Sequence, residues 1–408
     1  MTCYLPTIIM TVIWDFSMVW VLIYGLLINR KRPLDREFKP QRKGCVMSKI
    51  KLTEAMAEAI VLGGAVLGGG GGGDVAGGLR NAQLAVLMGS PVLISLDELD
   101  DEAPVITASA VGAPAAKDKM VRPIDHIRAL DQIMDLIGDQ QGKKLAGIIP
   151  NENGAGSGIN GWIQAAALNL PVVDAPANGR AHPTGLMGAM GLHRQKDYHS
   201  IQSAVGGNPD LDLYLEMICQ GKLAVTANLV RQAAVQAGGL VAVSRDPVRA
   251  AYLRENAAPG ATTQAMRVGQ AVLAEREKGG QAVIAAVVSA VGGQIACQGI
   301  VNRLQLETVG GYDIGLVVIE GDQAAELTFW NEFMTLEMDG IRQATFPELI
   351  TLLSLETGLP VSSAELTEGH EVAVLTAPQE SLILGKGVLL PETLAEAENA
   401  IGKPLVDL

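Results

Sequence analysis

One stretch decides the fold: residues 145–174, LAGIIPNENGAGSGINGWIQAAALNLPVVD. An apolar run, Leu145–Ile149, precedes a glycine-rich turn, a helical pattern over Ile159–Leu168 and a second apolar run that ends at Asp174. Apolar strands without polar alternation, separated by a helix, are typical of a parallel sheet that is covered on both faces. Ligands bind outside the carboxyl ends of such strands, so we expect Glu152 and Asp174 to face one crevice.

The same alternation of helices and short apolar strands extends from residue 47 to about residue 210. It predicts an α/β N-terminal domain with a mostly parallel sheet. Residues 211–408 are expected to form a helical segment, with helices over Leu211–Ala237 and Val248–Lys278, followed by a β-rich C-terminal domain. Closely spaced turn residues favour an antiparallel sheet there. The predicted strands are Ala282–Val291, Ile295–Glu307, Gly315–Glu320, Ala325–Phe333, Ile341–Ala344 and Glu371–Leu375.

Residues 1–46 differ from the rest of the chain. They hold six of the 15 aromatic residues and carry seven Lys or Arg against three Asp or Glu. The run Tyr4–Ile28 is long enough to span a bilayer, and the basic residues after it would stay in the cytoplasm. Alternatively, Met47 opens a plausible soluble N-terminus, and the first 46 residues are upstream sequence with a mis-assigned start. Both interpretations predict a cytoplasmic body, and only the first adds an inner-membrane anchor.

Composition excludes two classes of protein. The chain has 408 residues and a formal net charge of −13, which argues against a nucleic-acid surface because a duplex binder needs a basic face. The four cysteines lie far apart and form no CxxC pair, so neither a zinc ribbon nor a disulfide scaffold is indicated.

Six consecutive glycines, Gly68–Gly73, precede Asp74. Glycine lets the backbone adopt positive φ and approach a ligand closely, and a helix N-terminus after it would direct amide N–H groups at an anion. The run lacks a Gly-Lys-Ser/Thr ending and follows a helix, so it does not predict nucleotide binding. The alternative is a flexible or tightly packed connection between helices. The functional interpretation predicts these substrate-binding residues: Gly70, Gly71, Gly72, Gly73 and Asp74.

A second cluster follows Asp174 along the chain. Arg180 has a planar fork suited to a carboxylate or an imide-like oxygen, and His182 can bind a metal or move protons near neutral pH. Two nearby acids can divide acid and base roles, or hold a divalent cation when a histidine joins them. Helix caps and loop hydrogen bonds are the alternative roles for these acids. Glu152, Asp174 and Arg180 are therefore the predicted catalytic residues, with Asp174 and His182 as ligands of a divalent metal such as zinc.

Several motifs follow one another along the chain: Gly68–Gly73 with Asp74, Glu152-Asn-Gly154, Val172-Val-Asp174-Ala, Gly179-Arg180-Ala-x-Pro183, Asn331-Glu332, Pro347-Glu-Leu-Ile350 and Leu355-Glu-Thr-Gly358. In the order and spacing of these motifs the chain resembles the S-methyl thiohydantoin desulfurase family, which was long catalogued as a domain of unknown function. The resemblance extends from about residue 51 to about residue 376 and implies an α/β domain, a β-rich domain and action on a five-membered cyclic amide or thioamide. It also implies Asn153, Asn331 and Glu332 as substrate-binding positions.

Two functions of different classes follow. In the first, the protein is a hydrolase: water attacks a ring carbon of a hydantoin-like cyclic amide or an S-methyl thiohydantoin, and a thiol leaves or the ring opens. In the alternative, the chain is a non-catalytic subunit or a small-molecule binding module that partners a hydantoinase- or oxoprolinase-type enzyme. Both predict a small-molecule ligand, and a homo-oligomer is compatible with either.

Overall fold

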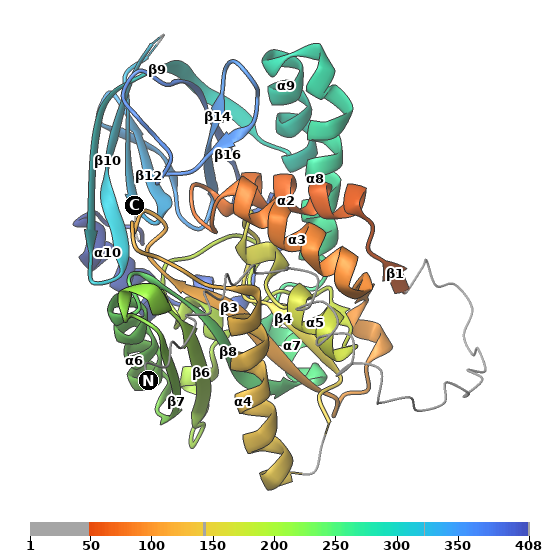
Figure 1. Ribbon diagram of the computed structural model, residues 1–408. Helices are drawn as coiled ribbons and strands as arrows, with labels where there is room; N and C mark the ends of the chain where they lie inside the picture. The colour runs from red at the N-terminus through yellow and green to blue at the C-terminus, as the bar shows by residue number, and fades with distance from the viewer. Residues whose placement is uncertain (1–48, 142–143, 322, 407–408) are drawn as a thin grey trace, which may run out of the picture. The chain divides into compact units, whose positions relative to one another are not determined.

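Two eight-stranded β-sheets, with helices packed on them, make up the part of the chain that the structure describes (Figure 1). The computed structural model describes residues 49–141, 144–321 and 323–406. The predicted membrane anchor or upstream sequence at residues 1–46 lies outside these residues. Among the described helices, none combines the length and hydrophobicity needed to cross a bilayer.

The first sheet confirms the predicted α/β class and is mixed. Its strand order is β1-β2-β5-β4-β3-β8-β6-β7; the neighbours β2, β5, β4 and β3 run parallel, and the other pairs are antiparallel. Every residue of β4 is buried, as expected for a strand covered on both faces. The strands are β1 (Lys49–Lys51), β2 (Val92–Ile94), β3 (Pro104–Gly112), β4 (Gly147–Pro150), β5 (Val172–Val173), β6 (Ser200–Gly206), β7 (Leu215–Gly221) and β8 (Leu240–Arg249).

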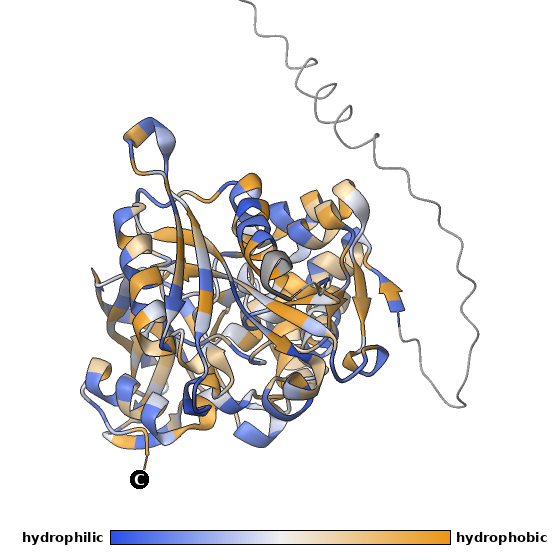
Figure 2. Cartoon of the chain, turned by 90° about the horizontal axis from the view of Figure 1, so that it is seen from below, coloured by the Kyte–Doolittle hydropathy of each residue, from blue (hydrophilic) through white to orange (hydrophobic). Residues whose placement is uncertain are grey.

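Helices cover both faces of this sheet. Neighbouring residues of a strand point to opposite faces. Accordingly, Ile148 joins a core with residues of α3, α4 and α5, whereas Ile149 joins a core with residues of α7. Figure 2 shows hydrophobic residues concentrated in the strands and hydrophilic residues in many peripheral turns. The helices are α2 (Glu54–Gly68), α3 (Val75–Gly89), α4 (Pro123–Gln141), α5 (Trp162–Leu168), α6 (Leu223–Gln236) and α7 (Ala250–Asn256).

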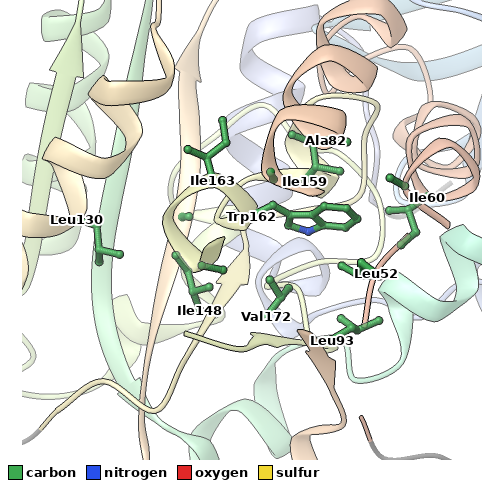
Figure 3. Close-up of a cluster of buried hydrophobic side chains, with 14 of the residues drawn as sticks. Leu52, Ile60, Ala82, Leu93, Leu130, Ile148, Ile159, Trp162, Ile163 and Val172 are labelled. Carbon is green, nitrogen blue, oxygen red and sulfur yellow. The ribbon is translucent and has the colours of Figure 1, made fainter. Parts of the chain in front are cut away.

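Trp162 is the largest side chain of the first core. Trp162 is fully buried, and Figure 3 shows its indole ring among Ile60 of α2, Ala82 of α3 and Val172 of β5. An aromatic side chain of this size dominates the burial of apolar area in a core. Trp162 therefore fixes α5, and with it the turn after β4, against the two helices that flank the glycine run.

The second sheet is antiparallel throughout, which confirms a β-rich C-terminal part. Its order is β13-β12-β11-β10-β9-β16-β14-β15. The strands are β9 (Gln294–Val309), β10 (Tyr312–Gly321), β11 (Ala325–Trp330), β12 (Glu332–Met338), β13 (Ile341–Thr345), β14 (Leu349–Ser354), β15 (Pro360–Val361) and β16 (Glu371–Ala377). The remaining helices are α8 (Ala261–Glu275), α9 (Gly280–Val291) and α10 (Pro391–Ile401).

Two predicted elements are wrong. Residues 215–221, predicted as helix, form strand β7, and its residues alternate between less and more exposed positions. Residues 282–291, predicted as a strand, lie in helix α9, where the buried Val283, Ile284, Val287 and Val291 follow helical spacing. The predicted boundary at residue 210 lies within the first sheet, because β7 and β8 come after it.

Helix α2 contributes to the cores of both sheets. Its first half packs with the first sheet, and Leu62, Val66 and Leu67 pack with residues of α8, α9 and β14. A side chain at Gly63 of α2 would overlap the carbonyl of Ala265 in α8, so glycine is what allows this close approach. The glycine run that follows α2 is therefore held at a junction between the two sheets.

Candidate active site

A cavity of about 550 Å³ lies beside the glycine run. Its lining comes from both sheets: Gly70–Gly73, the end of β3 and the turn after β4 contribute to it, as do residues 182–185 and the start of β12. The site thus forms where the carboxyl ends of parallel strands β3 and β4 meet the second sheet, in agreement with the general position of ligands in α/β folds.

Backbone hydrogen bonds fix the glycine run from two sides. The amides of Phe333 and Ser363 donate to the carbonyls of Gly69 and Gly70 at 2.8 and 2.9 Å. From the first sheet, the amides of Gly156 and Ser157 both donate to Gly72 O at 2.9 Å. The run is a fixed part of the cavity wall as a result.

The amide groups of the same run remain available. Gly70, Gly72 and Gly73 have φ of 96°, 82° and 87°, a region that glycine adopts without strain. None of the amide N–H groups of Gly70–Gly73 donates to another group in the described part of the chain. The four residues line the cavity and their amides have no protein acceptor, a combination that suits an anion or a developing negative charge.

Glu332 lies against this run. A side chain at Gly71 would overlap Glu332 Oε1, which requires glycine at that position. Glu332 is 2% exposed, and its Oε2 has no hydrogen-bond partner among the described residues. Burial, followed by the charge of Glu152, raises the pKa of Glu332 well above its ordinary value. The acid form of Glu332 is therefore favoured.

Glu152 is the second buried carboxyl group of the cavity. Asn151 Nδ2 and the backbone amide of His182 each donate to Glu152 Oε2 at 3.2 Å. Burial raises the pKa of Glu152 to about 7, an effect that the His182 amide partly offsets. Near neutral pH this carboxyl group can therefore either accept or donate a proton.

His182 and Arg245 complete this cluster. His182 Nε2 lies 3.3 Å from Glu152 Oε2 and 3.2 Å from Asn151 Nδ2. Burial lowers the pKa of His182 to about 3, so its ring is neutral at physiological pH. Arg245 donates to Asn151 Oδ1, and its positive charge favours the ionised form of Glu152. The guanidinium thus orients the amide that contacts both Glu152 and His182.

Asn331 lines the cavity next to Glu332. It lies between β11 and β12 with φ of 59°, a conformation that asparagine tolerates better than most residues. Its backbone amide donates to Asp313 O at 2.7 Å, and its Oδ1 accepts from the Asp313 amide at 2.9 Å. Asn331 therefore anchors the turn that presents Glu332 to the cavity.

The expectation that Asp174 shares a crevice with Glu152 is wrong. Asp174 accepts hydrogen bonds from the Thr262 amide at 2.9 Å and the Thr263 amide at 3.3 Å, and it also accepts from the Thr263 hydroxyl. It therefore caps the N-terminus of α8, and it is not among the residues that line the cavity. Strand β5 ends near the N-terminus of α8. Groups in the first turn of α8 donate hydrogen bonds to both carboxylate oxygens of Asp174.

Arg180 and Asn153 also lie outside the cavity lining. Arg180 is fully buried, donates to the carbonyls of Pro347 and Glu348, and lies 4.5 Å from the centre of the Phe346 ring. Asn153 Nδ2 donates to the carbonyls of Gly179 and Ala261 at 3.1 and 2.9 Å. Both residues position the backbone around the site. By contrast, Asp74 lines the cavity and caps α3 through the Gly77 amide at 2.6 Å.

The structure does not bring together the predicted metal ligands Asp174 and His182. The oxygens of Asp174 are bound to the N-terminus of α8, whereas His182 contacts Glu152. Within the described ranges, no group of three or more His, Cys, Asp or Glu side chains is arranged to hold a metal ion. The predicted pair therefore does not fit a divalent cation.

Several polar residues of the cavity were not predicted from the sequence. Asn151 is part of the quoted motif but received no role, and Arg245, Arg231 and His126 received none. Arg245 lies in β8 within Ser244-Arg245-Asp246, three consecutive polar residues in the middle of a mostly apolar strand, and all three are buried. Polar residues at buried strand positions were the available signal, because burial of such groups is rare without a partner or a role.

Comparisons with known proteins identify the family. Residues 55–208 match the model described as "S-Me-THD-like, N-terminal domain", and residues 222–387 match "S-Me-THD-like, C-terminal domain". A comparison with curated proteins finds no match. The chain is similar to a crystal structure of a protein from Chromobacterium violaceum, with a TM-score of 0.65 and 21% identity over 87% of this chain and 99% of that one. That similarity supports the fold, and the two family models show that the chain belongs to the S-Me-THD-like family, the family of S-methyl thiohydantoin desulfurase-like proteins.

Proposed function

We propose that the chain is a hydrolase that acts on an S-methyl thiohydantoin or a related hydantoin-like ring. One observation carries the proposal: two buried glutamates with raised pKa values, Glu152 and Glu332, line one cavity beside four amides without protein acceptors. Carboxyl groups whose burial moves their titration toward neutral pH are characteristic of acid–base catalysis. The family supports the class of reaction, and the cavity suggests which residues perform it.

Glu152 is the proposed general base. A water molecule beside its carboxylate would lose a proton to Glu152 as the water oxygen bonds to the ring carbon that carries sulfur. A base with a pKa of about 7 is half ionised at neutral pH and still accepts a proton well. Asn151 and the amide of His182 hold Oε2 in place, and Arg245 orients Asn151.

Glu332 is the proposed general acid. Its raised pKa favours the protonated form, which can give a proton to the ring nitrogen as water adds. The carbon–sulfur bond then breaks, the sulfur leaves with its bonding electrons and a proton, and the products are methanethiol and the corresponding hydantoin. The added hydroxyl loses its remaining proton to the Glu332 carboxylate as the carbonyl forms, and the leaving sulfur takes the proton that Glu152 removed from water, so both glutamates return to their starting states.

The glycine run is the proposed site for negative charge on the substrate. Addition of water places electron density on the heteroatoms of the ring, and amide donors that need no reorganisation stabilise that charge in a water-poor cavity. The amides of Gly70–Gly73 are such donors, since other hydrogen bonds hold the run from both sides.

The test is turnover by the purified protein alone. We expect it to release methanethiol from S-methyl thiohydantoins, measured with a thiol reagent, without an added subunit. Ring opening of hydantoins that carry no sulfur, measured on the same preparation, would indicate that the protein acts on cyclic amides. If the protein alone consumes none of these compounds and activity appears only with a hydantoinase- or oxoprolinase-type enzyme, the chain is a binding subunit and the proposal fails.

A further inference from the structure

The cavity extends beyond the two glutamates to a second end beside α4. Four residues of its lining define this end, which we call the α4 subsite: Ala110, Val121, His126 and Leu240. They come from β3, the segment before α4, the first turn of α4 and the start of β8. None of them belongs to the acid–base cluster of Glu152 and Glu332.

Strand register places Ala110 and Leu240 on one face of the first sheet. Ala110 follows Ile106 and Ala108 at intervals of two, so it points to the face whose core includes residues of α4. Leu240 pairs with Gly112, which shares that face with Ala110. A side chain at Gly206 would contact Val121 Cγ2 at 3.4 Å and lie 3.0 Å from Leu240 O, so Val121 lies where β6 ends and β8 begins, next to Leu240.

His126 gives this apolar end one polar group. The residue is 7% exposed and lines the cavity, and its imidazole ring makes no hydrogen bond with any other group in the described part of the chain. Burial lowers the pKa of His126 to about 4, so the ring is neutral and can both donate and accept one hydrogen bond. A buried polar side chain without a protein partner usually has a water or ligand partner.

Charged side chains lie elsewhere in this region. Arg80 and Lys119 also line the cavity, but both are exposed, and Lys119 Nζ donates to Pro114 O. The buried Asp125 beside His126 is paired with Arg122 at 2.8 Å. Arg231 is buried and also lines the cavity, but its guanidinium already donates to the carbonyls of Gly112, Gly311 and Pro183. A charged substituent in the α4 subsite would lose its hydration without gaining a buried counterion free of other partners, which is unfavourable.

We propose that the α4 subsite binds the substituent on the substrate ring and selects an uncharged, apolar group, aromatic or branched aliphatic, with at most one hydrogen-bonding atom next to His126. This inference rests on the proposed function. A cavity of about 550 Å³ falls in the range that holds drug-sized ligands, so a bare five-membered ring leaves much of it unfilled. The glutamates and glycine amides would hold the ring, and the α4 subsite would hold what the ring carries.

The test compares S-methyl thiohydantoins that differ only in the ring substituent: hydrogen, benzyl, 4-hydroxybenzyl and carboxymethyl. For the wild-type protein we expect kcat/KM for the benzyl compound to exceed those for the hydrogen and carboxymethyl compounds by about tenfold or more. Ala110→Leu, which fills the subsite, should remove the benzyl preference, so that kcat/KM falls by about tenfold more for the benzyl compound than for the unsubstituted ring. His126→Phe should reduce turnover of the 4-hydroxybenzyl compound more than that of the benzyl compound.

Ala364→Leu is the matched control, because Ala364 lines the same cavity from the second sheet. It should keep the benzyl preference. Equal effects of Ala110→Leu on the benzyl and unsubstituted compounds, or a preference for carboxymethyl, would overturn the inference. If the wild-type protein turns over none of the compounds, the proposed function fails, and calorimetric binding of the benzyl and unsubstituted rings to wild type and Ala110→Leu still decides the subsite by the same comparison.

Discussion

At neutral pH an exposed glutamate is ionised, whereas Glu152 titrates at a pKa of about 7 because burial disfavours its charge. Burial raises the pKa of Glu332 as well, and a negative charge on one of the two carboxylates makes ionisation of the other less favourable. The interior around these glutamates also contains positive charges, because three arginines are buried there: Arg180, Arg231 and Arg245. The site therefore combines two carboxyl groups with different tendencies to ionise.

These pKa values predict a bell-shaped dependence of kcat/KM on pH. Below pH 7 Glu152 holds a proton and cannot act as a base, so the rate should rise with pH and reach half its maximum near pH 7. It should fall again when Glu332 loses its proton. Arg245→Gln should move the rising limb to higher pH, because the variant lacks a charge that favours ionised Glu152. A rising limb near the ordinary glutamate pKa of about 4.3 would contradict the assignment.

Asp174 caps helix α8 and does not line the cavity. Asp174→Ala should lower the free energy of unfolding by about 2 kcal/mol, because it removes the cap of α8. Turnover per folded molecule should stay near that of the wild type. Urea unfolding and rate measurements on the same preparation test both parts.

Asp74→Ala is the comparison for that variant, because Asp74 caps α3 in a similar way but also lines the cavity. This variant should lose stability and activity together. An Asp174→Ala protein that is fully stable but inactive would show that Asp174 acts in the chemistry after all.

The glycine run permits an equally direct test. A side chain at Gly71 would overlap Glu332 Oε1, so Gly71→Ala should displace that carboxyl group and reduce kcat by at least about tenfold. Gly158→Ala is the control, since its added carbon would meet its nearest neighbours at 3.8 to 3.9 Å. The idea fails if both alanine variants retain wild-type kcat.

The sequence allows the elements around the parallel strands to be predicted better than those after residue 210. Apolar strands such as β4 carry a local signal, since every residue is buried. Helix α9 is rich in valine and alanine, and its short apolar sequence fits a strand as well as a buried helix until packing decides. Glu152 could be predicted because its motif follows the end of an apolar strand, and the glycine run because six consecutive glycines are themselves a local pattern. The helix that binds Asp174 lies about 90 residues further along the chain, and no local pattern indicates that contact.

On the scale of the whole described unit, the two sheets share a buried junction. Arg180 comes from the first half of the chain and donates to the carbonyls of Pro347 and Glu348 in the second. The glycine run bonds to both halves, and α2 packs into both cores. Residues from both halves also line the cavity. Site and junction are thus the same region of the molecule.

This arrangement predicts that both halves unfold in one transition. Arg180→Met should lower the free energy of unfolding by about 3 kcal/mol, because it removes a buried cation that is hydrogen-bonded across the junction. Arg249→Met, which removes an exposed ion pair with Glu102, should change it by less than about 1 kcal/mol. Differential scanning calorimetry should show a single peak that shifts with Arg180→Met. Two separate peaks in the wild type would contradict the shared junction.

The most direct test of the account is methanethiol release from a benzyl-substituted S-methyl thiohydantoin by Glu152→Gln. Glutamine keeps the shape of the side chain and removes the base, so the account predicts a loss of about a thousandfold in kcat with the fold retained. Glu365→Gln, at an exposed position of the same cavity, should stay within about threefold of the wild type. A folded Glu152→Gln protein that releases methanethiol at the wild-type rate would contradict the central claim.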